Sequence, residues 1–211
     1  MPDLFWGGAW GELELRRARD GSTNLSGRFP YGEEAVLSDG GRSGRPRKEI
    51  IESRAFGFRV DDPEAEIHLL SGHSFDKPLA SRGAGTLDLK DTAEALTFDA
   101  TITREIAETT HGRDALALIT AGLSTGISPG FRMPPERAVP RAEAETIEEE
   151  PVDPSKGQHG AIIRRIRQAL LFELSVVTRP AYPEAQIEAR NWTPGAPLVR
   201  PVTRHWRRWR L

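Results

Sequence analysis

Apolar and polar residues alternate at period two along much of this chain, which is the pattern of half-buried β-strands. Residues 95–102 show the alternation most clearly, with Leu96, Phe98 and Ile102 separated by polar or small residues. Residues 67–71 and 162–177 are richer in apolar side chains and predict strands with little exposure. Short turn-forming sequences with glycine or proline separate these stretches, so several short strands are expected to follow one another.

One segment has helical rather than strand periodicity. Apolar residues recur at helical spacing through residues 111–121, and Gly122 follows as a C-terminal stop. With one clear helix among many strands, the pattern predicts a β-rich α+β fold, built as an antiparallel, barrel-like sheet with few helices.

The distribution of charge and proline divides the chain into parts. Residues 1–26 are interpreted as an N-terminal leader, 27–190 as the folded domain and 191–211 as a basic tail rich in tryptophan and arginine. Within the domain, residues 134–160 combine proline, glutamate and alanine, which predicts a mobile acidic insertion.

Composition narrows the chemistry that the chain can perform. The 211 residues include no cysteine, which excludes a disulfide scaffold, a thiolate nucleophile and any cysteine-ligated metal. The formal net charge of −2 gives the whole molecule no bias toward nucleic acid or membrane. No apolar run approaches the roughly 18 residues of a membrane span, and no signal-peptide core begins the chain. We therefore expect a soluble intracellular protein that does not bind membranes.

Two short segments carry candidate catalytic groups. His73 follows the apolar run 67–71, and Ser128 lies among glycines and a proline in the sequence Gly-Ile-Ser-Pro-Gly. A serine hydroxyl is a weak nucleophile at neutral pH unless a neighbouring base accepts its proton, and imidazole suits that task. With five histidines and no cysteine, this pair is the best route to a hydrolase that the chain offers.

A third candidate is Glu173, an acid within the apolar stretch 170–177. A carboxylate among residues that favour burial needs a partner, and a histidine that must be oriented and stabilised as imidazolium is one. Pairing with Arg165 or Arg167, or a position at a solvent-facing edge, is the alternative. Of the other histidines, His68 alternates with apolar residues as a packing or surface residue would, and His111 suits the start of a helix.

In this order and spacing, several motifs together make the chain resemble the tailed-phage prohead serine proteases, which are distantly similar to herpesvirus assemblins. The resemblance covers about residues 27–190. The motifs are Glu49-Ile50-Ile51, Ala55-Phe56, Gly72-His73, Pro78-Leu79-Ala80, Gly112-Arg113-Asp114-Ala115, Gly126-Ile127-Ser128-Pro129-Gly130-Phe131 and Phe172-Glu173-Leu174-Ser175-Val176-Val177-Thr178-Arg179-Pro180-Ala181-Tyr182.

The resemblance implies an assemblin-like fold and a serine endopeptidase that acts through an acyl-enzyme. Ser128 would be the nucleophile and His73 the general base and then acid, with Glu173 as the third member, a role that assemblins give to a second histidine. Backbone N–H groups of Gly130 or of Thr178 and Arg179 would bind the oxyanion. Pro129 has no N–H and cannot contribute.

The resemblance also implies partners and a location. The substrates would be the major capsid protein and its scaffolding segment, cut in the host bacterial cytoplasm inside the assembling prohead, and the protease could also associate with itself or cleave itself. We expect no cofactor and no metal, because no two histidines have ligand spacing on one element.

Two other classes of function stay open at this point. A non-catalytic assembly protein on the same fold is one, since His73 is flanked by Gly72 and Ser74 where the family usually has asparagine and an acid. The other is a nucleic-acid-binding module that uses residues 204–210, where arginine alternates with tryptophan. A disordered, solubilising tail is the alternative interpretation of those residues.

Overall fold

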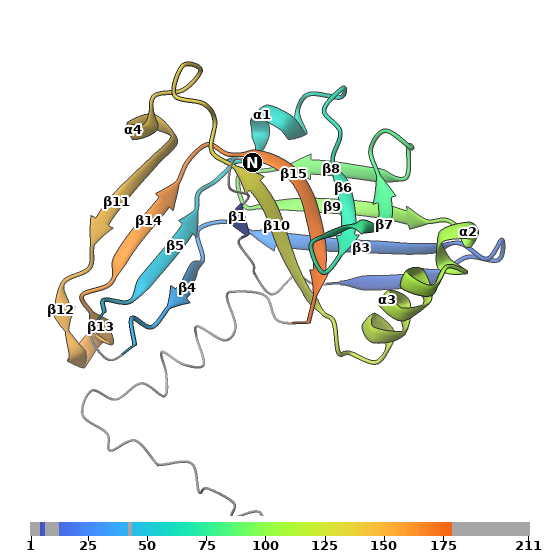
Figure 1. Cartoon of the computed structure of the whole chain (residues 1–211), viewed down its shortest axis with the longest axis horizontal. Helices are drawn as coiled ribbons and strands as arrows, with labels where there is room; N and C mark the ends of the chain where they lie inside the picture. The colour runs from blue at the N-terminus through green and yellow to red at the C-terminus, as the bar shows by residue number, and fades with distance from the viewer. Residues whose placement is uncertain (1–4, 7–12, 42–43, 179–211) are drawn as a thin grey trace, which may run out of the picture.

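The computed structural model of this protein describes residues 5–6, 13–41 and 44–178. Strands dominate them, and they form four sheets (Figure 1). Sheet A has the order β1-β10-β15-β6-β7, sheet B β2-β3-β9-β8 and sheet C β11-β14-β5-β4, while β12 and β13 form a two-stranded pair. The helices are α1 (Gly57–Val60), α2 (Arg104–Ala107), α3 (Thr110–Thr120) and α4 (Arg141–Ala144), with a 3-10 turn at Pro154–Lys156.

Sheet B is the regular half of the body. Along β3 buried and less buried residues alternate, and β3 pairs with β9 over its full length, from Thr23 opposite Ile102 to Pro30 opposite Ala95. One face therefore carries Leu25, Phe29 and other apolar side chains into the core, while the other stays polar. The strands are β2 (Glu14–Arg17), β3 (Thr23–Pro30), β8 (Leu87–Asp91) and β9 (Ala95–Ile102).

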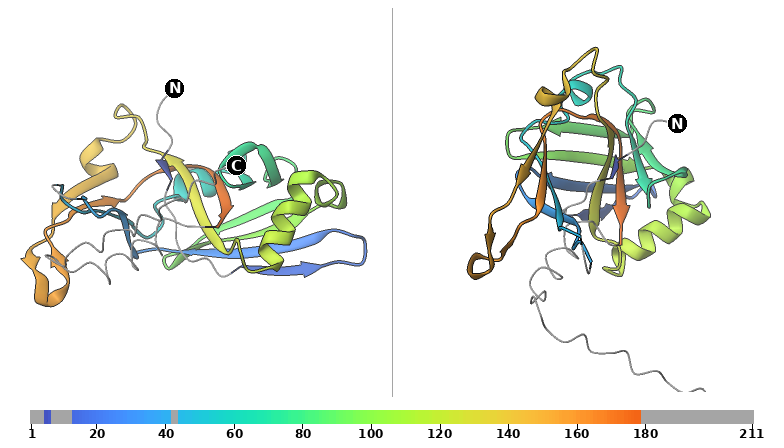
Figure 2. Two further views of the ribbon diagram at one scale, coloured as in Figure 1. Left: turned by 60° about the horizontal axis from the view of Figure 1, so that its bottom comes forward. Right: turned by 60° about the vertical axis from the view of Figure 1, so that its left-hand side comes forward.

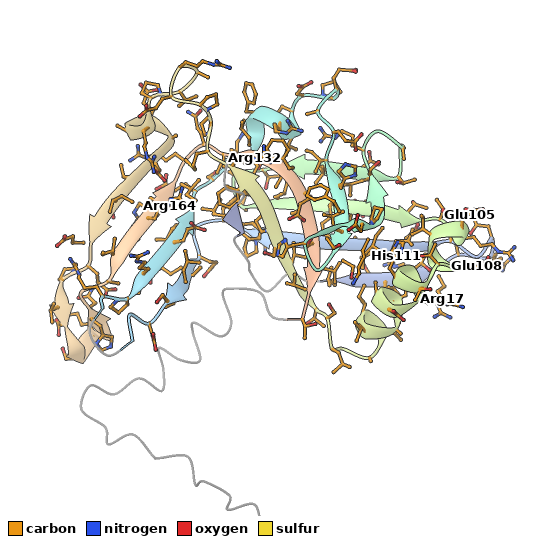
Figure 3. All side chains as sticks on the ribbon, viewed as in Figure 1. Arg17, Glu105, Glu108, His111, Arg132 and Arg164 are labelled. Atoms are coloured by element: carbon orange, nitrogen blue, oxygen red, sulfur yellow. The ribbon has the colours of Figure 1, made fainter. Side chains whose placement is uncertain are left out.

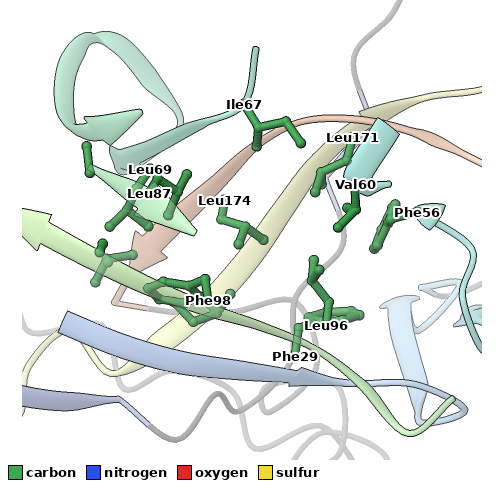
Figure 4. Close-up of a cluster of buried hydrophobic side chains, with 14 of the residues drawn as sticks. Phe29, Phe56, Val60, Ile67, Leu69, Leu87, Leu96, Phe98, Leu171 and Leu174 are labelled. Carbon is green, nitrogen blue, oxygen red and sulfur yellow. The ribbon is translucent and has the colours of Figure 1, made fainter. Parts of the chain in front are cut away.

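Sheet A covers the apolar face of sheet B, and the core lies between the two sheets. Figure 4 shows Phe29, Leu96 and Phe98 from sheet B facing Leu171 and Leu174 from β15. β6 runs parallel to β15, although about one hundred residues separate them in the chain. The strands are β1 (Phe5–Trp6), β6 (His68–Ser71), β7 (Ser74–Ser81), β10 (Gly126–Arg132) and β15 (Leu170–Val177).

Sheet C forms an arm that extends to one side of the body (Figures 1 and 2). It carries many charged residues, and its central strands β5 and β14 pair in parallel, with Glu49 opposite Arg164. The strands are β4 (Glu34–Ser38), β5 (Arg47–Ile51), β11 (Glu145–Glu149) and β14 (Ile162–Ile166), with β12 (Val152–Asp153) and β13 (Gln158–His159) at the tip.

The predicted β-rich fold with few helices is confirmed, and so is the helix that ends before Gly122, which has φ of 69°. The prediction of one antiparallel, barrel-like sheet is wrong for the described strands, which form separate sheets with two parallel pairings and no closed barrel. Period-two patterning sets which face of a strand is buried, but it does not select the neighbouring strand or its direction.

The division of the chain into leader, domain and tail stays a prediction, and regular elements lie on both sides of its first boundary. β2 lies inside the predicted leader and pairs with β3, so residues 14–17 are part of the body. The predicted insertion, residues 134–160, contains α4 and β11, and β11 pairs with β14; its mobility stays a prediction. The tail, residues 191–211, lies outside the described residues. Within the described part of the chain, no helix is long and apolar enough to cross a membrane.

Candidate active site

The register between β10 and β15 brings two of the three candidate residues to adjacent strands. Ser128 lies opposite Ser175, and Gly130 lies opposite Glu173. Directly opposed residues of an antiparallel pair point to the same face, and so do residues two apart on one strand. Ser128 and Glu173 therefore lie on one face of sheet A. Ile127, the neighbour of Ser128, lies in the core on the other face.

A β-bulge makes this arrangement compatible with the apolar sequence around Glu173. The register shifts after Gly130, so that Phe172 is an extra residue of β15. Without the bulge, Leu171 and Leu174 would point to opposite faces, because they are three positions apart on the strand. With it, both leucines reach the core and Glu173 faces the other way.

The third candidate, His73, is carried by a two-residue hairpin loop between β6 and β7. Ser71 pairs with Ser74, and both loop residues have positive φ, 63° at Gly72 and 60° at His73. This is the geometry of a type I′ turn, which matches the twist of the two strands. Gly72 adopts it without cost, whereas His73 is a non-glycine residue held in the left-handed region. The turn thus places a somewhat strained backbone at a candidate catalytic residue.

The turn delivers the imidazole to the buried carboxylate. His73 Nδ1 lies 2.8 Å from Glu173 Oε1, and the Glu173 side chain is fully buried. An ionised carboxylate can only accept hydrogen bonds, so this contact assigns the proton to Nδ1. Nε2 then carries the lone pair and is the nitrogen available as a base.

Ser175 completes the cluster, and sequence reasoning missed its role. Its Oγ accepts a hydrogen bond from the backbone N–H of His73 at 2.9 Å and donates one to Glu173 Oε2 at 2.6 Å. The same hydroxyl therefore holds both the turn and the carboxylate. The available signal was the spacing: two residues after Glu173 on a strand, Ser175 had to share its face.

Gly130 is required by the position of the carboxylate. It lies within β10, between β15 and β1, and a Cβ at this residue would approach Glu173 Oε1 to 2.0 Å. No side chain fits there without moving Glu173. The structure therefore shows a steric reason for Gly130, while its role as an oxyanion donor stays a prediction.

Burial differs among the members of the cluster. Ser128 is 2% exposed and Ser175 is fully buried, whereas the His73 side chain is 21% exposed. Solvent thus reaches the cluster chiefly at the imidazole. A partly dry site strengthens each polar contact within it, because the local dielectric is low.

The other residues considered from the sequence lie elsewhere or have other contacts. Thr178 is exposed and directly follows β15, while Arg179 lies outside the described residues. Arg165 pairs with Glu148 and lies within 3.8 Å of Glu52, so the alternative partner for Glu173 is excluded there. Arg167 reaches Glu52 and Thr146 instead.

His68 and His111 lie outside the candidate cluster and contact other groups. His68 packs edge-on against the Phe75 ring at 5.8 Å, with Glu66 Oε1 3.9 Å from its Nδ1. His111 is in the first turn of α3, and its Nε2 lies 3.0 Å from the Pro78 carbonyl oxygen (Figure 3). Among the described residues, no group of three or more His, Cys, Asp or Glu could hold a metal ion.

The arrangement of an oriented imidazole, a buried carboxylate and a serine on the adjoining strand suits nucleophilic hydrolysis. A family model described as caudovirus prohead serine protease matches residues 41–195, which is more than half of the chain. This match confirms the resemblance found in the sequence. No curated protein and no solved structure matches the chain.

Proposed function

The chain belongs to the caudovirus prohead serine protease family and is a serine-type peptidase, and we propose that it is the endopeptidase that cuts capsid or scaffolding protein during prohead maturation. The observation that carries the proposal is the 2.8 Å contact between His73 Nδ1 and Glu173 Oε1 on the face of sheet A that Ser128 shares. The likeness of the body to the assemblin fold stays part of the proposal, because it rests on motifs.

Each residue has a defined role in the proposed reaction. Ser128 Oγ attacks the scissile carbonyl carbon while His73 Nε2 takes the hydroxyl proton, and Glu173 stabilises the imidazolium through Nδ1–H. The tetrahedral intermediate collapses as His73 returns this proton to the leaving amine, which leaves an ester on Ser128. Water then attacks the ester, His73 again accepts and returns one proton, and the carboxylic acid product leaves Ser128 restored.

The developing oxyanion needs backbone donors, and two places suit it. Gly130 follows Ser128 by two residues on β10, and Thr178 begins the segment after β15, at the end where Gly126 starts β10. We assign the donor to Gly130 or to Thr178 and Arg179. Removal of one such donor lowers kcat by about 10²–10³-fold in serine proteases.

Replacement of the nucleophile tests the proposal. Co-expression with the cognate major capsid protein should give a shortened capsid protein, and Ser128→Ala should abolish the cleavage, with a loss of about 10⁴-fold or more. A fluorophosphonate probe should label wild-type Ser128, as mapped by mass spectrometry.

The matched control is Ser124→Ala, which removes another buried serine hydroxyl four residues earlier in the chain. It should keep both cleavage and labelling. Cleavage that survives Ser128→Ala, or labelling at a different serine, would contradict the assignment.

A further inference from the structure

A pair of arginines lies on the same face of sheet A as the catalytic cluster. We infer that Arg132, supported by Arg59, forms a subsite for an acidic side chain of the substrate polypeptide, about two to four residues from the cleaved bond. The inference rests on the proposed function, since it concerns which polypeptides that same site accepts.

The position of Arg132 follows from the alternation along β10. Ile127 and Phe131 face the core, so Ser128, Gly130 and Arg132 face the catalytic side. At about 3.4 Å per residue, the Cα atom of Arg132 lies about 14 Å from that of Ser128. Figure 3 shows Arg132 at the end of β10 that lies near α1.

Both guanidinium groups lie against one aromatic ring. Arg132 Cζ is 4.9 Å and Arg59 Cζ 4.3 Å from the centroid of Phe172, the bulged residue beside Glu173. The ring therefore holds two cations at the residue that directly precedes the catalytic glutamate in β15. A single arginine over a ring is a common packing contact, but two like charges on one ring repel each other.

The guanidinium groups of Arg59 and Arg132 also have few hydrogen-bond acceptors among the described residues. Nε of both arginines is buried without a hydrogen-bond partner among the described residues. Among the described residues, the Arg59 guanidinium donates only to the Glu66 carbonyl oxygen, and Asp62 and Glu66 attract it without an ion pair. Burial lowers the pKa of Arg59, and Arg82 acts in the same direction.

The Arg132 side chain makes no ion pair or hydrogen bond with any described residue, and its guanidinium lies over the Phe172 ring. Glu173, the acid nearest in sequence, is already engaged by His73 and Ser175. Buried, unpaired donors cost free energy that an incoming carboxylate would recover. Because a guanidinium matches a carboxylate in both geometry and charge, an acidic side chain is the ligand that fits.

The surface beyond the arginines also suits an extended polypeptide. An apolar pocket of about 250 Å³ begins next to them, and it is lined by Phe58, which precedes Arg59, and by Leu170, which lies opposite Arg132. Because β1 and β15 pair with both edges of β10, the substrate would lie over this face of sheet A, and a peptide that ran along β10 from Ser128 would pass the arginine pair before it reached this pocket. The pair therefore lies on the path of the substrate rather than on a remote surface.

Positional profiling with a peptide library tests the inference. The full chain is incubated with a proteome-derived peptide library, and the cleaved bonds are read by mass spectrometry. Wild type should enrich Asp or Glu at one position two to four residues from the cleaved bond. Arg132→Gln should lose the enrichment and lower kcat/KM for acid-containing peptides by about 10- to 100-fold, mainly through KM, while peptides without the acid are cut as before.

Two further variants separate recognition from support of the fold. Arg132→Glu should shift the preference toward Lys or Arg at that position, and Arg137→Gln, which removes an exposed charge five residues later, should change nothing. An equal loss on all peptides, or a wild type that cleaves without acidic preference, would overturn the subsite and leave the proposed function standing. A chain that cleaves no peptide would contradict both.

Discussion

The body and the arm each bury a glutamate, but they give it different partners. In the body, Glu173 is paired with His73 and Ser175. In the arm, Glu49 is 2% exposed and lies 3.2 Å from Arg164 Nη1, and the same arginine binds Glu145 through Nε. A guanidinium stays charged at every accessible pH, whereas an imidazole can lose and regain its proton.

The comparison explains why one cluster can work in catalysis and the other can only support the fold. Arg164 divides its charge between two acids, so burial dominates at Glu49 and raises its pKa to about 7. Glu145 is closer to Arg164 and also binds Arg141, and these contacts lower its pKa. The arginine cluster thus keeps a permanent positive charge in the arm, whereas the role that we propose for the histidine cluster in the body is to accept a proton.

Glu173→Gln should have the largest effect and should separate activity from stability. A glutamine amide can donate to His73 Nδ1, which favours the wrong tautomer, so we expect kcat to fall by about 10⁴-fold. The free energy of unfolding should change much less, since the amide fills the same space. Peptidase kinetics and urea denaturation measure the two quantities. A loss of unfolding free energy as large as the increase in activation free energy would show that Glu173 supports the fold as much as it supports activity.

Arg164→Met should lower stability and leave activity unchanged, which is the opposite of the effect of Glu173→Gln. Removal of the shared cation leaves Glu49 and Glu145 buried with fewer partners, which costs about 3–5 kcal/mol of unfolding free energy. The kcat of the folded fraction should stay at the wild-type value. As a control, Arg165→Met breaks only more exposed contacts, with Glu148 and Glu52, and should cost about 0–1 kcal/mol. Equal losses of unfolding free energy in the two variants would show that the buried Arg164 cluster contributes no more to stability than an exposed ion pair.

Glu49 should also make the stability of the arm depend on pH. Between its ordinary pKa of 4.5 and its folded value of about 7, the folded chain keeps a proton that the unfolded chain has released. The free energy of unfolding should therefore decrease as pH rises through this window, by roughly 3 kcal/mol, and level off above it.

Comparison of Glu49→Gln with wild type isolates this contribution, because the variant should lack that decrease while other titrating groups act in both. Chemical denaturation at pH 5, 6, 7 and 8 measures it. Two parallel curves would show that Glu49 does not titrate in this window.

Ser175→Ala should have the smallest effect of these substitutions, but it should lower both the free energy of unfolding and kcat. Loss of the hydroxyl leaves Glu173 Oε2 and the His73 amide without their hydrogen bonds, which costs about 1–3 kcal/mol. A looser His73 should lower kcat by about 10- to 100-fold, as misplacement of about 1 Å does. Ser124→Ala is the control and should leave kcat unchanged. An unchanged kcat in Ser175→Ala would limit its role to the fold.

Much of the body could be predicted because local patterns decide it. The alternation in β9 and the helix before Gly122 depend on residues close in sequence. The candidate residues also depend on local sequence, since His73 follows an apolar run, Ser128 lies among glycines and a proline, and Glu173 lies within an apolar stretch. The role of Ser175 was not found, because it depends on contacts with two separate elements.

What the sequence determined by itself is several strands of the body, the helix before Gly122, the family and the three candidate residues, since each depends on residue types in short segments. The tertiary structure alone decided the strand order, the parallel pairings, the bulge at Phe172 and the left-handed turn that carries His73 to Glu173. It also decided that Arg59 and Arg132 meet on one ring. Residues far apart in the chain make these contacts, and their selection depends on packing the whole core rather than on local preference.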